Sequence, residues 1–230
     1  MAKHSKRFLK LKKEVEGIQP QTVDAAVKKL KGFGTTKFDQ SVEVAIRLGI
    51  DPKHADQGVR GSVSLPHNIG KSVRVAVFAQ GDRAEAAKAA GADVVGAEDL
   101  AEKVKGGFMD FDVCLASTDM MKVVGPLGRV LGPKGLMPTP KTGTMVDMNT
   151  DISKAVREFK AGKVEFRADA TGIVHALVGK LSLADDQLIA NIDAFINHIR
   201  TVKPSAVKGQ YIRSVTLSAT MSPGVPINAA

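Results

Sequence analysis

The residues in this chain whose chemistry stands out are cations, hydroxyls and glycines at turns and strand ends. The segment 163–180 reads KVEFRADATGIVHALVGK, with a turn at Asp169–Gly172. Hydroxyls and glycines such as those of Thr171 and Gly172 can reach a 2′-hydroxyl or phosphate oxygen where longer side chains do not fit. Ser214 and Thr220 offer the same chemistry near the end of the chain. Candidate phosphate contacts are Lys37, Arg167 and Lys180.

Signals for catalysis are weak by comparison. No G-x-G-x-x-G opens a helix, no Walker loop is present, and the five histidines show no metal-ligand spacing. Gly81 follows an apolar strand, as in the first turn of a nucleotide-binding sheet. This glycine motivates the alternative hypothesis, a nucleotide-dependent α/β enzyme. The segment Gly132–Gly135 lacks a following helix that would direct backbone donors at a phosphate. We therefore predict no catalytic residue, metal, cofactor or small-molecule substrate.

The composition favours a polyanionic partner in a reducing compartment. The 230 residues carry a formal net charge of +9, which is typical of nucleic-acid-binding proteins and less often of membrane-binding ones. Aromatic residues total 4%, which argues against a base-stacking platform. The single cysteine, Cys114, excludes an intramolecular disulfide and lies in a predicted buried strand, consistent with the cytoplasm. No apolar segment is long enough to span a bilayer.

The charge is unevenly distributed along the chain. Residues 71–160 contain 13 basic and 12 acidic side chains, whereas the two flanks together contain 20 and 12. The flanks therefore hold nearly all of the positive charge. In residues 3–13, six cations occur with no acid, which predicts either a solvated, partly frayed arm or an arm that lies on phosphates.

Apolar periodicity predicts that the flanks form an antiparallel sheet with helices on one face. The hairpin 163–180 is the point at which the chain re-enters this domain. Phe38 shares a strand face with Val42 and Val44, which favours a core position over a stacking role. The other predicted elements of the flanks are a helix over 22–30, strands over 38–48 and 59–65, a helix over 183–202 and a strand over 211–220, with 221–224 closing the ordered part.

Between the flanks, short strands and helices alternate, which is typical of a mostly parallel sheet covered on both faces. The predicted strands are 72–79, 92–95 and 111–116, and the predicted helices are 82–90, 96–105, 117–124 and 151–160. We predict an α+β domain built from residues 1–70 and 161–230, with an inserted three-layer Rossmann-like α/β domain over 71–160. Gly70 and Gly162, at the crossovers, are candidate hinges. Arg167 and Thr220 are expected to share one surface.

These residues and motifs resemble the bacterial L-one family, the proteins of the mobile stalk of the large ribosomal subunit. The resemblance covers nearly the whole chain, and its central motif, LGPKGLMP, is long and specific. The matching segments are Lys37–Phe38, Ser41–Val44, Gln57–Gly61, Leu131–Pro138, Thr171–His175 and Thr220–Met221.

The resemblance implies a non-catalytic ribosomal RNA-binding protein. It implies binding of the 23S rRNA stalk as a monomer within the ribosome, assistance in releasing deacylated tRNA from the E site, and repression of the protein's own messenger through the same surface. The inserted domain would make lesser contacts with the stalk RNA. The implied contact residues are Lys37, Phe38, Ser41, Arg167, Asp169, Thr171, Gly172, His175, Ser214, Thr220 and Met221. The chain departs from the family's usual pattern at Ser222, where Gly is usual, and at Ala170, where Lys is frequent.

Overall fold

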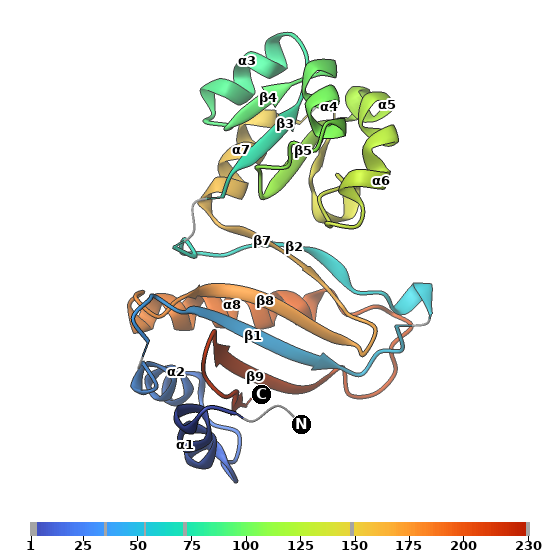
Figure 1. Ribbon diagram of the computed structural model, residues 1–230. Helices are drawn as coiled ribbons and strands as arrows, with labels where there is room; N and C mark the ends of the chain where they lie inside the picture. Colours follow the sequence, from blue (N-terminus) through green and yellow to red (C-terminus); the bar gives the residue numbers. More distant parts are fainter. Residues whose placement is uncertain (1–3, 35, 53, 71–72, 148–149, 229–230) are drawn as a thin grey trace. The chain divides into compact units, whose positions relative to one another are not determined.

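The computed structural model describes residues 4–34, 36–52, 54–70, 73–147 and 150–228 (Figure 1). Its residue contacts divide the chain into two compact units. The first unit comprises residues 1–70 and 164–230, so it is built from both chain ends, and the second comprises residues 71–163.

The first unit is built on a four-stranded antiparallel sheet in the order β10–β9–β1–β8. Strand β1 lies between two strands from the carboxyl-terminal half, so Val44 faces both Ala176 and Leu217. The strands are β1 (Ser41–Leu48), β8 (Ile173–Lys180), β9 (Ile212–Ala219) and β10 (Val225–Ile227). A separate two-stranded sheet pairs β2 (Arg60–Ser64) with β7 (Lys163–Arg167).

This pairing corrects the expected hairpin. The turn at Asp169–Gly172 is present, but the described segments beside it are joined only locally: an isolated bridge pairs Ala168 with Val174, and the amide of Asp169 donates a hydrogen bond to the carbonyl of Ile173 at 2.9 Å. Strand β7 instead pairs with β2, and Phe166 of β7 packs edge-on against Phe195 at a ring-centroid distance of 5.8 Å. Phe166 is therefore buried in the core of the first unit, on a strand that pairs with β2 and not with β8.

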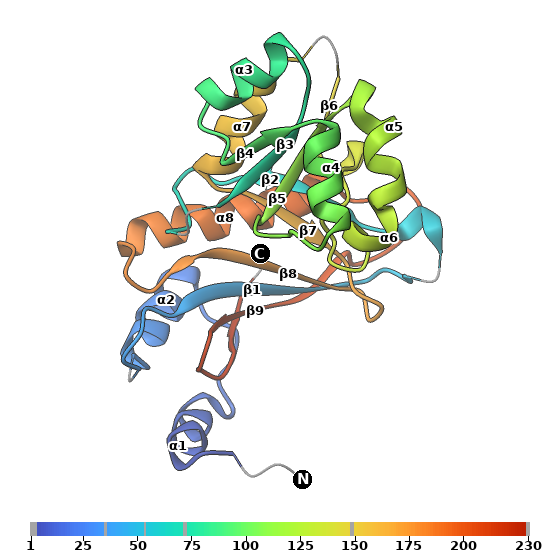
Figure 2. The ribbon, with the colours of Figure 1, turned by 45° about the horizontal axis from the view of Figure 1, so that its top comes forward.

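Within its described residues, the first unit also contains three α-helices: α1 (Lys6–Val15), α2 (Val23–Gly32) and α8 (Asp185–Thr201) (Figures 1 and 2). The hydroxyl of Thr22 caps α2 by accepting a hydrogen bond from the amide of Ala25. Helix α8 contacts β8, and α2 contacts β9, β10 and α8. A parallel bridge between Gln21 and Ile227 brings the two ends of the chain together. A short 3₁₀ turn, η1, covers Ala55–Gln57.

One buried amide ties α8 to its neighbours. Asn191 is fully buried, and its Nδ2 donates hydrogen bonds to the carbonyls of His67 at 3.1 Å and Val178 at 2.9 Å. Its Oδ1 accepts a hydrogen bond from the amide of His67 at 3.0 Å. The side chain therefore joins the segment after β2, helix α8 and strand β8 without leaving its own polar atoms unpaired.

The second unit contains a parallel sheet in the order β4–β3–β5–β6. Alternate residues of β3 face opposite sides: Ala76 and Phe78 join an apolar cluster with α4, whereas Val75 and Val77 join one with α3 and α7. Helices therefore cover both faces (Figure 1). Its strands are β3 (Val75–Phe78), β4 (Val94–Gly96), β5 (Val113–Ser117) and β6 (Met145–Val146), and its α-helices are α3 (Asp82–Ala89), α4 (Glu98–Lys105), α5 (Met121–Val124), α6 (Gly128–Leu131) and α7 (Ile152–Ala161). The 3₁₀ turns are η2 (Thr118–Met120), η3 (Gly125–Leu127) and η4 (Pro140–Thr142).

Several expectations need correction. The predicted end of order at residues 221–224 is wrong, because β10 follows it, and β6 was not predicted. The basic arm folds as α1 from Lys6, and Lys3, where the predicted arm starts, lies outside the described residues. Ser72, at the start of a predicted strand, and Lys71, where the predicted inserted domain begins, also lie outside them. Cys114 is buried in β5, as predicted, and burial raises the pKa of its thiol to about 12.

Candidate nucleic-acid interface

The outer face of the four-stranded sheet carries exposed polar side chains, beside the half-buried Ile173 and Leu177. Along β1, Val42, Val44, Ile46 and Leu48 are buried, and the residues between them are exposed or half-buried. His175 of β8 lies opposite Ala45, and Ser214 of β9 lies opposite Arg47. Directly opposed residues in an antiparallel pair point to the same side of the sheet. Glu43, Arg47, His175 and Ser214 are exposed on this outer face.

One group of predicted contact residues lies where β1 begins and β9 ends. The amide of Ser41 donates a hydrogen bond to Thr220 Oγ1 at 3.0 Å, and the amide of Thr220 donates to the carbonyl of Ser41 at 3.1 Å. Lys180 lies opposite Ser41 on the other neighbouring strand. We call this cluster the first group; its members are Lys37, Phe38, Ser41, Lys180, Thr220 and Met221.

Phe38 corrects the expectation of a core position. Its side chain is 53% exposed, and β1 begins only at Ser41. The chain turns before the strand: the carboxylate of Asp39 accepts hydrogen bonds from the amide and hydroxyl of Ser182 at 3.2 and 2.8 Å. The alternation that runs from Val42 to Leu48 therefore does not extend back to Phe38. Met221, which follows Thr220, is likewise 48% exposed, so the first group contains two large exposed apolar side chains.

The second group lies at the opposite end of β1. Here the carbonyl of Gly172 accepts a hydrogen bond from the amide of Leu48 at 2.9 Å, which attaches the turn 169–172 to the end of the strand. Ser214 lies beside Arg47, and His175 follows on β8. The members of the second group are Arg167, Asp169, Thr171, Gly172, His175 and Ser214.

Asp169 organises the turn of the second group. Its Oδ1 accepts hydrogen bonds from the amides of Ile173 and Thr171, both at 2.8 Å, and from the Thr171 hydroxyl at 2.7 Å. These bonds, with the Ile173 amide as the largest cause, lower the pKa of the carboxyl group. Gly172 has a φ of +78°, and a Cβ there would lie 3.3 Å from Cγ1 of Ile50. The turn thus requires both a carboxylate and a glycine.

Arg167 and Thr220 are not brought together. They belong to different groups, one at each end of β1, and the six residue steps from Ser41 to Arg47 correspond to roughly 20 Å of strand. The predicted residues therefore form two groups that are joined by the outer sheet face, rather than one cluster.

The two candidate hinge glycines have left-handed backbones. Gly70 has a φ of +72°, and a Cβ at this position would lie 3.4 Å from Cδ of Lys180. Gly162 has a φ of +114° and caps α7, with its amide donating to the carbonyls of Glu158 and Phe159. Their role as hinges stays a prediction.

Sequence reasoning missed two residues that hold Met221. The side-chain Oε1 of Gln40 accepts a hydrogen bond from the amide of Met221 at 3.0 Å, although Gln40 is only 2% exposed. The guanidinium of Arg7 donates to the carbonyl of Met221 at 3.0 Å. A signal for Gln40 existed, because it is a polar residue on the apolar face of the predicted strand. No comparable signal singled out Arg7.

The Ser222 departure is accommodated within its turn. The Ser222 hydroxyl accepts a hydrogen bond from the amide of Ala219 at 2.9 Å and donates to the carbonyl of Pro223 at 3.1 Å. The side chain thus helps to close the turn that carries Met221. Ala170, the other departure, is exposed at the tip of the turn in the second group.

In the second unit, an arginine occupies the carboxyl ends of the parallel strands, where α/β sheets commonly bind ligands. Arg83 donates hydrogen bonds to Ser117 Oγ at 2.6 Å and to the carbonyls of Asp147 and Thr150 at 2.7 and 2.8 Å. Among the described residues, no group of three His, Cys, Asp or Glu side chains is arranged to hold a metal ion. No helix within the described ranges is long and apolar enough to cross a membrane.

Comparison with known proteins agrees with the motif resemblance. The model of the Ribosomal protein L1p/L10e family matches residues 27–223. The chain is 52% identical over 228 residues to the protein named "Large ribosomal subunit protein uL1" from Marinomonas sp. (strain MWYL1), covering 99% of this chain and 97% of that protein. The family is one of ribosomal structural proteins, so the alternative of a nucleotide-dependent enzyme is wrong. The chain belongs to the Ribosomal protein L1p/L10e family.

Proposed function

We propose that this protein binds 23S rRNA in the stalk of the large ribosomal subunit, in the cytoplasm, through the outer sheet face of its first unit. The observation that carries the proposal is the placement of polar and cationic side chains at both ends of that face. The first group offers Lys180 and the Thr220 hydroxyl, and the second offers Arg167 and the Thr171 hydroxyl. The excess of positive charge in the flanking segments supports a polyanionic partner.

The spacing of the two groups suits a folded RNA better than a short single strand. Roughly 20 Å separates their ends, and between them β9 carries short side chains at Thr216 and Ser218. Small hydroxyl side chains permit close approach to ribose 2′-hydroxyls, which distinguishes RNA from DNA. Phe38 and Met221, both large and exposed, are suited to pack against bases or ribose at one end.

We further propose the domain roles and the additional functions that the resemblance implies. Residues 1–70 and 161–230 form the RNA-binding domain, and residues 71–160 form an inserted Rossmann-like domain without a cofactor. Gly70 and Gly162 act as hinges, and the protein works as a monomer within the ribosome. Assistance in releasing tRNA from the E site and repression of the protein's own messenger complete the proposal. Support for these finer points comes from the family match alone.

Quantitative RNA binding tests the proposal. The probe is a transcript of the 23S rRNA stalk, with an unrelated hairpin of equal length as the control. We expect tight, selective binding whose logarithm falls linearly with the logarithm of salt concentration, by about 0.7–0.9 per phosphate contact. Equal affinity for the two RNAs, or affinity insensitive to salt, would overturn the proposal.

Repression of the protein's own messenger has its own test. A transcript of the messenger's leader should compete with the stalk transcript for the protein, because one surface would bind both. Simultaneous binding of the two RNAs, or no binding of the leader, would contradict a shared surface.

A further inference from the structure

The amino-terminal helix α1 carries an exposed row of lysines. Lys6, Lys10 and Lys13 recur at steps of four and three residues, so they share one helical stripe, and all three are exposed. Leu11, on the opposite side of α1, is 7% exposed and belongs to the core cluster of the first unit. The helix therefore buries one side and presents its cations to solvent.

Contacts fix α1 beside the first group. Arg7 donates to the carbonyl of Met221 at 3.0 Å, and the amide of Met221 donates to Oε1 of Gln40. The rings of Phe8 and His4 are tilted by 31° with centroids 4.9 Å apart, and the Ser5 hydroxyl caps the helix by accepting a hydrogen bond from the amide of Phe8.

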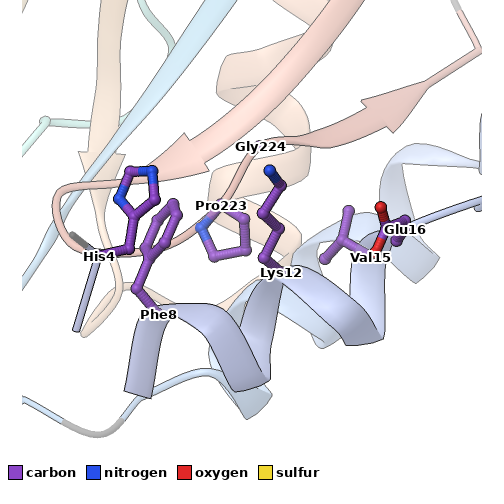
Figure 3. Close-up of a pocket in the computed structure, with 7 residues that line it drawn as sticks. All are labelled: His4, Phe8, Lys12, Val15, Glu16, Pro223 and Gly224. Carbon is purple, nitrogen blue, oxygen red and sulfur yellow. The ribbon is translucent and has the colours of Figure 1, made fainter. Parts of the chain in front are cut away.

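A groove of about 440 Å³ lies between α1 and the turn at Pro223–Gly224 (Figure 3). Phe8, Lys12 and Val15 line the helical side of this groove. The turn itself is packed on the sheet, since a Cβ on Gly224 would lie 2.6 Å from Cγ2 of Thr216. The helix therefore borders the same short segment, residues 221–224, that continues from Thr220.

We propose that α1 is part of the RNA interface, with Lys6, Lys10 and Lys13 binding the phosphate backbone of the RNA that the first group holds. This inference rests on the proposed function. The continuity from Thr220 through Met221 to Arg7 favours a shared ligand, and the charge of the stripe is complementary to phosphate.

A membrane surface fits this helix less well. Basic helices that lie on membranes insert their apolar side among the lipids. The apolar side of α1 packs within the protein instead: Leu11 belongs to the core cluster of the first unit, and Val15 packs against that cluster. Leu9, at 45% exposure, is the exposed large apolar residue of α1.

The test compares salt dependence in two charge-matched variants. The triple variant Lys6→Gln/Lys10→Gln/Lys13→Gln removes the stripe. The control Lys88→Gln/Lys103→Gln/Lys105→Gln removes the same charge from exposed positions of the second unit. With the 23S stalk transcript as probe, the magnitude of the log–log slope should fall by about 2–3 in the stripe variant, because each of the three lost phosphate contacts lowers it by about 0.7–0.9. The control should keep the slope of the unmodified protein.

Each outcome bears on the inference separately from the proposed function. Equal slopes in the stripe variant and the unmodified protein would overturn the inference, while selective, salt-dependent binding by the unmodified protein would leave the proposed function intact. Equal reductions in both variants would also overturn it, because they would reflect net charge alone. If the stripe variant keeps the RNA slope but loses binding to anionic phospholipid vesicles, the lysines bind a membrane surface rather than RNA, and the inference is overturned. Matching circular dichroism spectra and melting temperatures of the three proteins exclude unfolding as the cause.

Discussion

Thr220 and Ser41 hold each other by reciprocal hydrogen bonds. The Ser41 amide donates to the Thr220 hydroxyl oxygen at 3.0 Å, and the Thr220 amide donates to the Ser41 carbonyl at 3.1 Å. The Thr220 hydroxyl thus fastens the end of β9 to the start of β1 while it remains on the surface. A single side chain serves both the sheet and the proposed contact with RNA.

We therefore expect Thr220→Val to weaken stalk RNA binding by about 1–3 kcal/mol and stability by about 1 kcal/mol, because the Ser41 amide and the RNA both lose a partner. Thr220→Ser keeps the hydroxyl and should retain most of both. Filter binding and urea unfolding measure the two effects. A folded Thr220→Val protein with unchanged affinity would contradict the role of this hydroxyl.

Asp169 should make stability depend on acid pH. Its folded-state pKa is lowered, so its stabilising effect is fully present above the unfolded pKa of about 4 and is lost as the pH falls through the folded value. We expect Asp169→Asn to melt at a lower temperature than the unmodified protein at neutral pH, and this difference to shrink below about pH 4. Glu102→Gln, an exposed change in α4, is the control. A pH-independent difference would argue against the carboxylate as the cause.

Gly172 should tolerate no side chain without loss. Alanine would be strained by the φ of +78° and would also press against Ile50. Gly209→Ala provides the control, because Gly209 has a φ of +82° but no atom within 4 Å of the place that a Cβ would take. We expect a loss of about 1–2 kcal/mol for Gly209→Ala and about 2–3 kcal/mol for Gly172→Ala in urea unfolding. Only Gly172→Ala should also weaken RNA binding, and equal effects of the two variants would contradict this.

Asn191 should be a strong determinant of stability. Asn191→Leu leaves the carbonyls of His67 and Val178 and the amide of His67 without this partner in the interior, which we expect to cost about 2–4 kcal/mol of unfolding free energy. Asn197→Ala, an exposed change on the same helix, should be within about 0.5 kcal/mol of the unmodified protein. Chemical denaturation measures both, and a neutral Asn191→Leu would show that the packing absorbs the loss.

Cys114 should be inert in the folded protein. Burial raises its thiol pKa to about 12, so very little reactive thiolate exists at neutral pH. We expect a thiol-specific reagent to label it only slowly under native conditions and fully in denaturant. Rapid labelling of the native protein would contradict its placement in the β5 core.

Strand periodicity predicted much of the first unit, because a buried face imposes strict alternation. The apolar positions Val42, Val44 and Ile46 correctly gave the inner face of β1. The same rule failed at Phe38, because alternation says nothing of where a strand starts. Strand β10 was not predicted, because residues 221–224 were expected to close the ordered part. Its Pro226 is tolerated because β10 lies at the edge of the sheet.

Local sequence patterns did not predict which strands pair. The turn at Asp169–Gly172 marked a reversal of the chain, yet β7 pairs with β2, which lies about a hundred residues earlier in the sequence. The division of the candidate site into two groups follows from the register of β1 with β8 and β9. Short motifs identify the candidate residues one by one, whereas only the register determines which of them are neighbours.

The central position of β1 has a consequence for biosynthesis. This strand leaves the ribosome early, but both of its neighbours, β8 and β9, are translated much later. Until then its edges have no native partner, and neither Thr220 nor the Asp169 turn exists. The nascent protein therefore has no complete surface for RNA until translation is nearly finished, so fragments that stop before β9 should be incompetent for capture of the stalk.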